Sequence, residues 1–315
     1  MSIDIPPQAI RCTSLDEFES FLASAANRGA DIAAFEVGLP KHPLLSARLS
    51  AWFERRARAL TKRAPITNGE SFIFRGYCAV CDREAAFLVD YMNTTTSNGR
   101  LLPSWRETLW CPHCHLNNRM RAAVSFLTSA SKPDDAIYLT EFVTALFQVV
   151  ASKRKRTIGS EYLRAGTAQG ATNAVGVRHE DVTRLSFPDS AFNIIGTFDV
   201  LEHVPNYRQA LTEFFRCLRP GGTLVISVPF LLQSATTVTR ATVESSGAIT
   251  HLLPPEIHGD PLNQDGVLCF YHFGWDLVGA LTETGFQDAG LSIYWNPRLG
   301  YVGGYQLLIT ARKSG

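Results

Sequence analysis

The second half of the chain alternates between short apolar runs and amphipathic segments. The runs, rich in β-branched and aromatic residues, predict seven strands. These strands span residues 137–140, 156–159, 175–178, 194–198, 223–228, 290–294 and 305–311. Apolar residues spaced three and four apart predict helices at 142–152, 207–218 and 275–284. Because strands and helices alternate, we expect an α/β domain whose mostly parallel sheet carries helices on both faces and closes with two consecutive strands.

The first part of the chain has a different pattern. Ser14-Leu-Asp-Glu17 is a capping box that predicts a helix, and a second helix is predicted at 44–60. Short strands at 72–74 and 87–89, a polar loop at 94–99 and a helix at 116–127 follow. We expect three domains, which are a helical N-terminal segment (1–70), a small module (71–123) and the α/β domain (124–315) with a lid insertion at about 230–273.

The small module carries two Cys-x-x-Cys pairs, Cys78–Cys81 and Cys111–Cys114. Two such pairs complete a tetrahedral thiolate site of the kind that Zn²⁺ prefers. His113 and His115 flank the last cysteine and are alternative ligands. We expect a structural zinc bound by the four cysteines in a zinc-ribbon-like module.

Composition and charge indicate which partners and which cellular compartment to expect. The 315 residues are 45% hydrophobic with a formal net charge of +1, so no global positive field favours nucleic acid or membrane surfaces. The N-terminus lacks a secretory pattern, and no apolar run is long enough to span a membrane. Cys12, Cys217 and Cys269 are scattered singly, which indicates a reducing compartment rather than a disulfide framework. We expect a cytoplasmic protein.

Acidic residues follow the predicted strands where a ligand would bind, at the carboxyl ends of an open parallel sheet. Glu161 follows the second strand and is placed to accept both hydroxyls of a ribose. Asp181 and Val182 follow the third, where a carboxylate and a backbone N–H can contact an adenine ring. Asp199 follows the fourth, ahead of Glu202 and His203.

Two segments carry a family resemblance, "DVLEHV" (199–204) and "LRPGGTLVISVP" (218–229). They resemble the small-molecule branch of the class I S-adenosylmethionine-dependent methyltransferases, over about residues 137–312. The resemblance implies a Rossmann-like seven-stranded sheet and an S-adenosyl-L-methionine cofactor. It further implies that Glu161 binds the ribose and Asp181 the adenine amine, and that Phe198 and Asp199 line the methionine end.

One segment departs from the family pattern. The first strand of these proteins normally runs into a glycine-rich turn, but the residues from 137 to 146 include no glycine. In one interpretation the turn is rebuilt, with Glu141 binding the cofactor ammonium and the Thr140 and Thr144 hydroxyls replacing backbone contacts. In the other, the site is inactive or binds something else. The acidic positions favour cofactor binding.

Methyl transfer often needs a base near the acceptor. His258, in the predicted lid, is the first candidate, with Asp260 as a group that would orient its ring. His203 is the second candidate, ahead of His251 and His272. The alternative for each is a structural histidine.

We therefore expect a methyltransferase acting on a hydroxyl of a small molecule or glycan. Two other hypotheses remain, an RNA base methyltransferase and a non-catalytic binding protein with a decayed cofactor site. The near-neutral charge disfavours nucleic acid. The sequence does not specify the oligomeric state.

Overall fold

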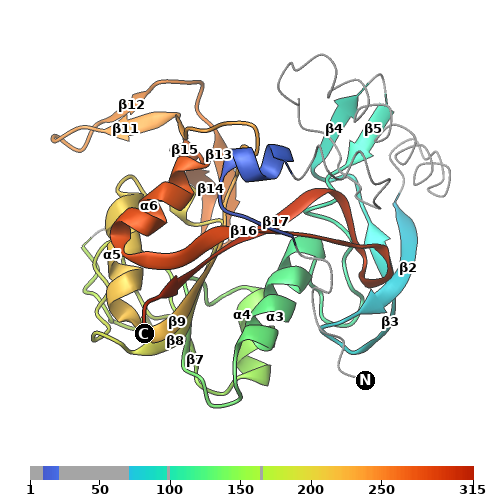
Figure 1. The fold of residues 1–315 in the computed structure, drawn as a ribbon, viewed down its shortest axis with the longest axis horizontal. Coiled ribbons are helices and arrows are strands. Elements are labelled where there is room, and N and C mark those ends of the chain that lie inside the picture. Colours follow the sequence, from blue (N-terminus) through green and yellow to red (C-terminus); the bar gives the residue numbers. More distant parts are fainter. Residues whose placement is uncertain (1–9, 21–70, 98–99, 164–165) are drawn as a thin grey trace. The chain divides into compact units, whose positions relative to one another are not determined.

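The computed structural model describes residues 10–20, 71–97, 100–163 and 166–315 (Figure 1). The chain divides into two compact units. The cysteine unit contains the described residues of Met1–Cys12, Asp16–Ser129 and Ser292–Leu307. The sheet unit contains Thr13–Leu15, Ala130–Leu291 and Leu308–Gly315. The helix predicted at 44–60 lies outside the described residues, whereas residues 15–20 are helical as expected from the capping box.

The cysteine unit is built on a β-hairpin. Strands β2 (Phe72–Cys78) and β3 (Arg83–Val89) pair antiparallel from Phe72↔Val89 to Cys78↔Arg83. Alternate residues of β3, namely Ala85, Phe87 and Val89, are buried, as the period of a half-buried strand requires. Both predicted strands are confirmed, and the hairpin turn carries the first cysteine pair.

A second hairpin replaces a predicted loop. The prediction of a loop at 94–99 is wrong for residues 94–97. These residues form strand β4 (Thr94–Ser97), which pairs antiparallel with β5 (Arg100–Pro103). Its run of β-branched threonines favours extended backbone over the turn propensity of the following residues. Helix α3 (Asn118–Ala130) follows the second cysteine pair and begins where the Asn117 side chain accepts a hydrogen bond from Met120 N at 3.0 Å.

The sheet unit contains most of a seven-stranded sheet in the order β1-β16-β17-β9-β8-β6-β7. The strands are β1 (Ile10–Cys12), β6 (Ile137–Leu139), β7 (Thr157–Gly159), β8 (Phe192–Phe198), β9 (Leu218–Ser227), β16 (Phe286–Asn296) and β17 (Tyr301–Lys313). Strands β7, β6, β8 and β9 are parallel, and β17 runs antiparallel to β9. The α/β class and six of the predicted strands are confirmed, in a mixed sheet.

The predicted strand at 175–178 is wrong. Its residues form a turn in which Asn173 Oδ1 accepts from Val175 N and Val177 N, and Gly176 takes a positive φ of 85°. Asparagine and glycine supply the turn chemistry that overrides the apolar run. Only isolated bridges, Thr172↔Arg178 and Glu161↔His179, remain. The seventh strand is β1, from the part of the chain predicted to be helical.

Three α-helices complete the sheet unit: α4 (Ala145–Lys153), α5 (Tyr207–Cys217) and α6 (Asp276–Thr284). All three predicted helices are confirmed with shifted ends. Asn206 caps α5 by accepting from Gln209 N, and Gly285, with φ of 112°, ends α6. Leu224, Val225 and Ile226 of β9 are all fully buried, as expected for a strand covered on both faces. Among the described helices, none is long and apolar enough to cross a membrane.

The segment 230–273 has its own secondary structure (Figure 1). It contains three short antiparallel ladders, each between two strands. The pairs are β10 (Val238–Thr239) with β15 (Tyr271–His272), β11 (Ala241–Val243) with β12 (Ile249–His251), and β13 (Ile257–Asp260) with β14 (Asn263–Leu268). The region predicted as a lid is therefore built from ladders rather than from irregular loop.

The division into units differs from the three expected domains, because Ser292–Leu307 groups with the cysteine unit. One link between α3 and this segment is Arg121, whose side chain is fully buried. It donates to Leu299 O at 2.6 Å and Gly300 O at 3.0 Å and lies 4.0 Å from the Phe87 ring centroid. One charged side chain thus satisfies the carbonyls that end the 3₁₀ turn η2 (Pro297–Leu299).

We predict that Arg121→Ala lowers the free energy of unfolding by about 1.5–3 kcal/mol, the usual range for hydrogen bonds to a charged group. Urea denaturation measures the change. Arg83→Ala, at an exposed position of β3, is the matched control and should change stability by less than about 0.5 kcal/mol. Equal effects of the two substitutions would contradict the anchoring role.

Candidate functional site

The turn after β6 is closed without glycine. Thr144 caps α4 by accepting from Phe147 N at 3.2 Å, and its hydroxyl also hydrogen-bonds to the carboxylate of Glu141, which is buried. Thr140, also buried, donates to Thr197 Oγ1 at 3.0 Å. The side chains that the sequence analysis assigned to a rebuilt turn therefore hydrogen-bond within it or to the neighbouring strand.

Glu161 completes this turn from the next strand. Its Oε1 accepts from Phe142 N at 2.7 Å and from Val143 N at 2.9 Å. Within the described residues, Oε2 has no hydrogen bond. Burial raises the pKa of Glu161 against the lowering effect of these N–H groups, and the charge of Asp260 raises it further. A carboxylate with one oxygen in the turn and one outside it suits a ligand that brings hydroxyl donors.

Asp181 also uses one carboxylate oxygen for hydrogen bonds within its own turn. Oδ1 accepts from Thr183 N at 2.9 Å and Thr183 Oγ1 at 2.7 Å, while Asp181 N donates to Gln169 Oε1 at 2.7 Å. The neighbouring Val182 is buried. Asp181 follows the turn and bridge segment, not a strand, so its position depends on this Asx-type turn.

At the end of β8 the backbone turns sharply. Asp199 has a positive φ of 54°, which places it in the left-handed region that aspartate tolerates better than most residues. Its N–H donates to Ser227 O at 2.8 Å, and its Oδ1 accepts from Ser227 Oγ at 3.1 Å. Phe198 is buried beside it in the chain. Strands β8 and β9 thus hold Asp199 at their common carboxyl edge.

Two histidines meet after β8. His203 belongs to the 3₁₀ turn η1 (Leu201–His203) and His258 to β13, and their rings cross edge to face with centroids 4.9 Å apart. His203 Nδ1 hydrogen-bonds to Leu268 O at 2.8 Å. Burial lowers the pKa of His203, and the neighbouring His258 lowers it further. The structure therefore brings together the two candidate bases that are 55 residues apart in the sequence.

Two glutamates complete this group and were not singled out from the sequence. Glu202 is fully buried, and its Oε1 lies 3.8 Å from His203 Nε2 and 3.9 Å from His258 Nδ1. Glu256 Oε1 accepts from His258 Nε2 at 2.9 Å. The sequence offered one indication for Glu256. It lies two residues before His258, and in an extended segment residues two apart lie on the same face.

The expectation that Asp260 orients the His258 ring is wrong. The register of β13 against β14 shifts between His258 and Asp260, so the bulge breaks the alternation that would place both on one face. Asp260 Oδ1 instead accepts from Leu262 N at 2.8 Å, within the turn. Of the other histidines, His272 Nε2 hydrogen-bonds to Glu256 Oε1 at 3.0 Å, and His251 is exposed.

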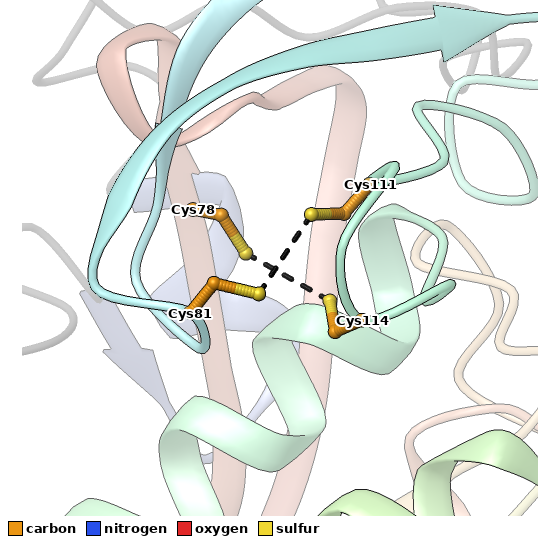
Figure 2. Close-up of side chains that lie close together, drawn as sticks. All are labelled: Cys78, Cys81, Cys111 and Cys114. Atoms are coloured by element: carbon orange, nitrogen blue, oxygen red, sulfur yellow. Dashed lines mark hydrogen bonds between the residues drawn. The ribbon is translucent and has the colours of Figure 1, made fainter.

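A second cluster lies in the cysteine unit. Figure 2 shows the side chains of Cys78, Cys81, Cys111 and Cys114 pointing toward one another from two turns. Two sulfur–sulfur distances, Cys78–Cys114 and Cys81–Cys111, are 3.9 Å, and all four sulfurs lie within 4.8 Å of one another. The cysteines are free thiols. His113 and His115 are exposed and lie outside the cluster.

This geometry fits one tetrahedral metal ion. Sulfurs about 2.3 Å from a zinc ion are about 3.8 Å apart along each edge of the tetrahedron, whereas a disulfide needs about 2.05 Å. Without a cation the thiols cannot all ionise. A hydrogen bond from Cys114 lowers the pKa of Cys78 to about 5, whereas burial raises the pKa of Cys81 to about 12.

Part of the sheet unit is similar to known proteins. Residues 142–226, from the glycine-less turn to the end of β9, match the family model described as "Methyltransferase domain". They include Glu161, Asp181, Asp199 and His203. The match ends before the insertion that carries His258.

Two curated relatives match parts of the chain. A Mycolicibacterium smegmatis protein named "Probable S-adenosylmethionine-dependent methyltransferase" is 34% identical over 83 residues, 26% of this chain and 32% of that protein. The ubiquinone/menaquinone biosynthesis C-methyltransferase of Hahella chejuensis is 28% identical over 169 residues, 52% of this chain and 62% of that protein. The chain thus spans about a third and about three fifths of these relatives.

Among solved structures, an S-adenosylmethionine-dependent methyltransferase from Mesorhizobium loti is similar, with 17% identity and a TM-score of 0.37. The similarity covers 62% of this chain and 98% of that one. The family model thus matches residues 142–226, and both curated relatives carry names of methyltransferases.

Proposed function

We propose that the protein is an S-adenosylmethionine-dependent methyltransferase that methylates a hydroxyl group of a small molecule or glycan. The observation that carries the proposal is that Glu161, Asp199 and His203 follow strands β7 and β8 in the segment that matches a methyltransferase domain, with the His258 ring against that of His203. S-adenosylmethionine supplies an electrophilic methyl group on a sulfonium. Residues of the chain bind this cofactor and activate the acceptor hydroxyl.

The cofactor residues are proposed as a set. Glu161 Oε2 accepts from the ribose hydroxyls, and Asp181 with the Val182 N–H contacts the adenine. The ammonium binds at Glu141, with Thr140 and Thr144 holding the turn, and Phe198 and Asp199 line the methionine end. The hydrogen bonds of Glu161 and Asp181 support these roles, because within the described part of the chain each carboxylate uses one oxygen and leaves the other without a hydrogen bond.

The acceptor hydroxyl is proposed to be activated at His258 and His203. His258 donates through Nε2 to Glu256, so in the neutral ring its Nδ1 carries the lone pair that a general base needs. The hydroxyl loses its proton to this base as its oxygen attacks the methyl carbon. A C–O bond forms, the C–S bond breaks, and the electron pair stays on the sulfur of S-adenosylhomocysteine.

We further propose that the four cysteines bind one structural Zn²⁺ in a module separate from the methyltransferase domain. Four thiolates leave no open coordination position, so this ion stabilises and does not catalyse. Free thiols in this arrangement suit a reducing compartment, and we propose the cytoplasm.

Cys111→Ser is predicted to remove zinc and destabilise the cysteine unit, because metal-binding energy at such sites is folding energy. Metal analysis should find about one zinc per chain before the substitution, since one four-thiolate site holds one ion. Cys217→Ser, a buried thiol of α5, is the control and should keep the zinc. A metal-free protein of unchanged stability would refute this assignment.

Glu161→Ala is predicted to weaken S-adenosylhomocysteine binding by about 1.5–3 kcal/mol, the range for hydrogen bonds to a charged group. Glu161→Gln separates two roles, because its carbonyl oxygen can still accept from the turn while its NH₂ group cannot accept from a ribose hydroxyl. Calorimetric titration measures both variants. Glu283→Gln, at an exposed position, is the control. Binding that is indifferent to Glu161 would show that the ligand or its site is wrong.

His258→Ala is predicted to lower turnover by about 10²–10⁴-fold, the usual range for general-base help, with nearly unchanged affinity for S-adenosylhomocysteine. His251→Ala, in the same insertion but exposed, should retain full turnover. Methyl transfer to candidate hydroxyl acceptors is measured with labelled S-adenosylmethionine. Lost stability, or no effect, would assign His258 a structural role instead.

A further inference from the structure

The group formed by Glu202, His203 and His258 has the composition of a metal site. The three residues come from η1 and from β13, and their ligand atoms lie within 4.8 Å of one another. Two ligand atoms that share an ion at about 2.1 Å can be at most about 4.2 Å apart. The separations of 3.8 Å and 3.9 Å from Glu202 Oε1 to the two rings are within that limit and are too long for direct hydrogen bonds.

Hydrogen bonds on the outer side fix which ring nitrogens face the group. The carbonyl of Leu268 can only accept, so His203 Nδ1 carries a hydrogen. The carboxylate of Glu256 likewise requires a hydrogen on His258 Nε2. In the neutral rings, His203 Nε2 and His258 Nδ1 then present lone pairs toward Glu202 Oε1. All three facing atoms are acceptors, an arrangement that a cation between them stabilises.

The outer contacts are those typical of metal-bound histidines, which usually donate their second N–H to a carbonyl or a carboxylate. Here His203 uses a carbonyl and His258 uses Glu256. Glu256 is itself held by Arg240 Nη2 at 3.1 Å and by His272 Nε2 at 3.0 Å. Glu256 also clusters with Cys269 and His272. Because Arg240 already supplies a positive charge there, that second cluster is the weaker candidate for a cation.

We propose that Glu202, His203 and His258 bind one divalent first-row metal cation. Two imidazoles and one carboxylate suit ions such as Mn²⁺, Fe²⁺, Co²⁺ or Zn²⁺. Three protein ligands leave coordination positions open for a substrate. The site is distinct from the four cysteines, which belong to the other unit.

The consequence for the reaction rests on the proposed methyltransferase function. An acceptor with two neighbouring oxygens, such as adjacent hydroxyls of a sugar, fills the open positions. The cation lowers the pKa of the hydroxyl, whose proton passes to water before the oxygen attacks the methyl carbon. The C–O bond forms and the C–S bond breaks without any change in oxidation state. In this arrangement His203 and His258 act as metal ligands, so the cation takes over the activation of the hydroxyl that the proposed function assigns to the His258 base.

Binding of Mn²⁺ to the full chain carrying a single equivalent of zinc, which occupies the four cysteines, followed by electron paramagnetic resonance, tests the proposal. Mn²⁺ stands at the low end of the divalent affinity order and suits nitrogen and oxygen ligands better than thiolates, so it will not replace the ion at the cysteines. We expect one bound Mn²⁺ per chain. Glu202→Gln and His203→Ala should each weaken binding by more than about ten-fold, and Glu256→Gln by about 10–100-fold, as for other outer-shell residues. His251→Ala should bind Mn²⁺ as the unsubstituted chain does.

Absence of Mn²⁺ binding, or binding that survives these substitutions, would overturn the proposal. If Glu202→Gln fails to fold by circular dichroism, Glu256→Gln decides, because its partly exposed side chain tolerates replacement. Titration with S-adenosylhomocysteine separates this proposal from the proposed function. Cofactor binding without Mn²⁺ binding refutes the metal site alone, and Mn²⁺ binding without cofactor binding refutes the methyltransferase assignment alone.

Discussion

Buried acceptor atoms need hydrogen donors or cations, and this requirement organises three groups of side chains in the structure. In the turn after β6, the partly buried carboxylate of Glu161 receives two backbone N–H groups. Near η1, the buried Glu202 faces the rings of His203 and His258. In the cysteine unit, four sulfurs converge at tetrahedral spacing. In the first case backbone N–H groups are the donors, and the other two groups are the proposed metal sites.

The glycine-less turn illustrates how a local departure is compensated by a neighbour. A glycine-rich turn lets backbone N–H groups approach a ligand closely. Here two of those N–H groups are used by Glu161, and the turn is fixed by Thr144 and Glu141. One carboxylate thus holds the turn through one oxygen and offers the other outside it. A ligand at this edge would meet side-chain oxygens where a glycine-rich turn would offer backbone N–H groups.

The insertion between β9 and α6 carries His258 and contacts the turn η1 that carries His203. Its ladders hold His258 in place through β13, and the bulge after His258 sends Asp260 into a turn. Leu268 of β14 fixes the ring of His203, so the insertion orients both histidines. The segment that matches the family model ends before this insertion, so the orientation of these two histidines depends on a part of the chain outside the match.

The sequence by itself determined the α/β class, six of the seven strands, three helices of the sheet unit and the pairing of two cysteine knuckles, because each depends on local periodicity or fixed spacing. It misassigned residues 175–178, where the turn preference of Asn173 and Gly176 overrides an apolar run. Only the tertiary structure brought Glu202, Glu256 and the two histidines together and drew Ser292–Leu307 into the cysteine unit. The approach of Glu202 to His258 and the hydrogen bonds of His203 to Leu268 and of Arg121 to Leu299 join residues more than 50 positions apart. No local pattern encodes which distant partner a buried charge will find.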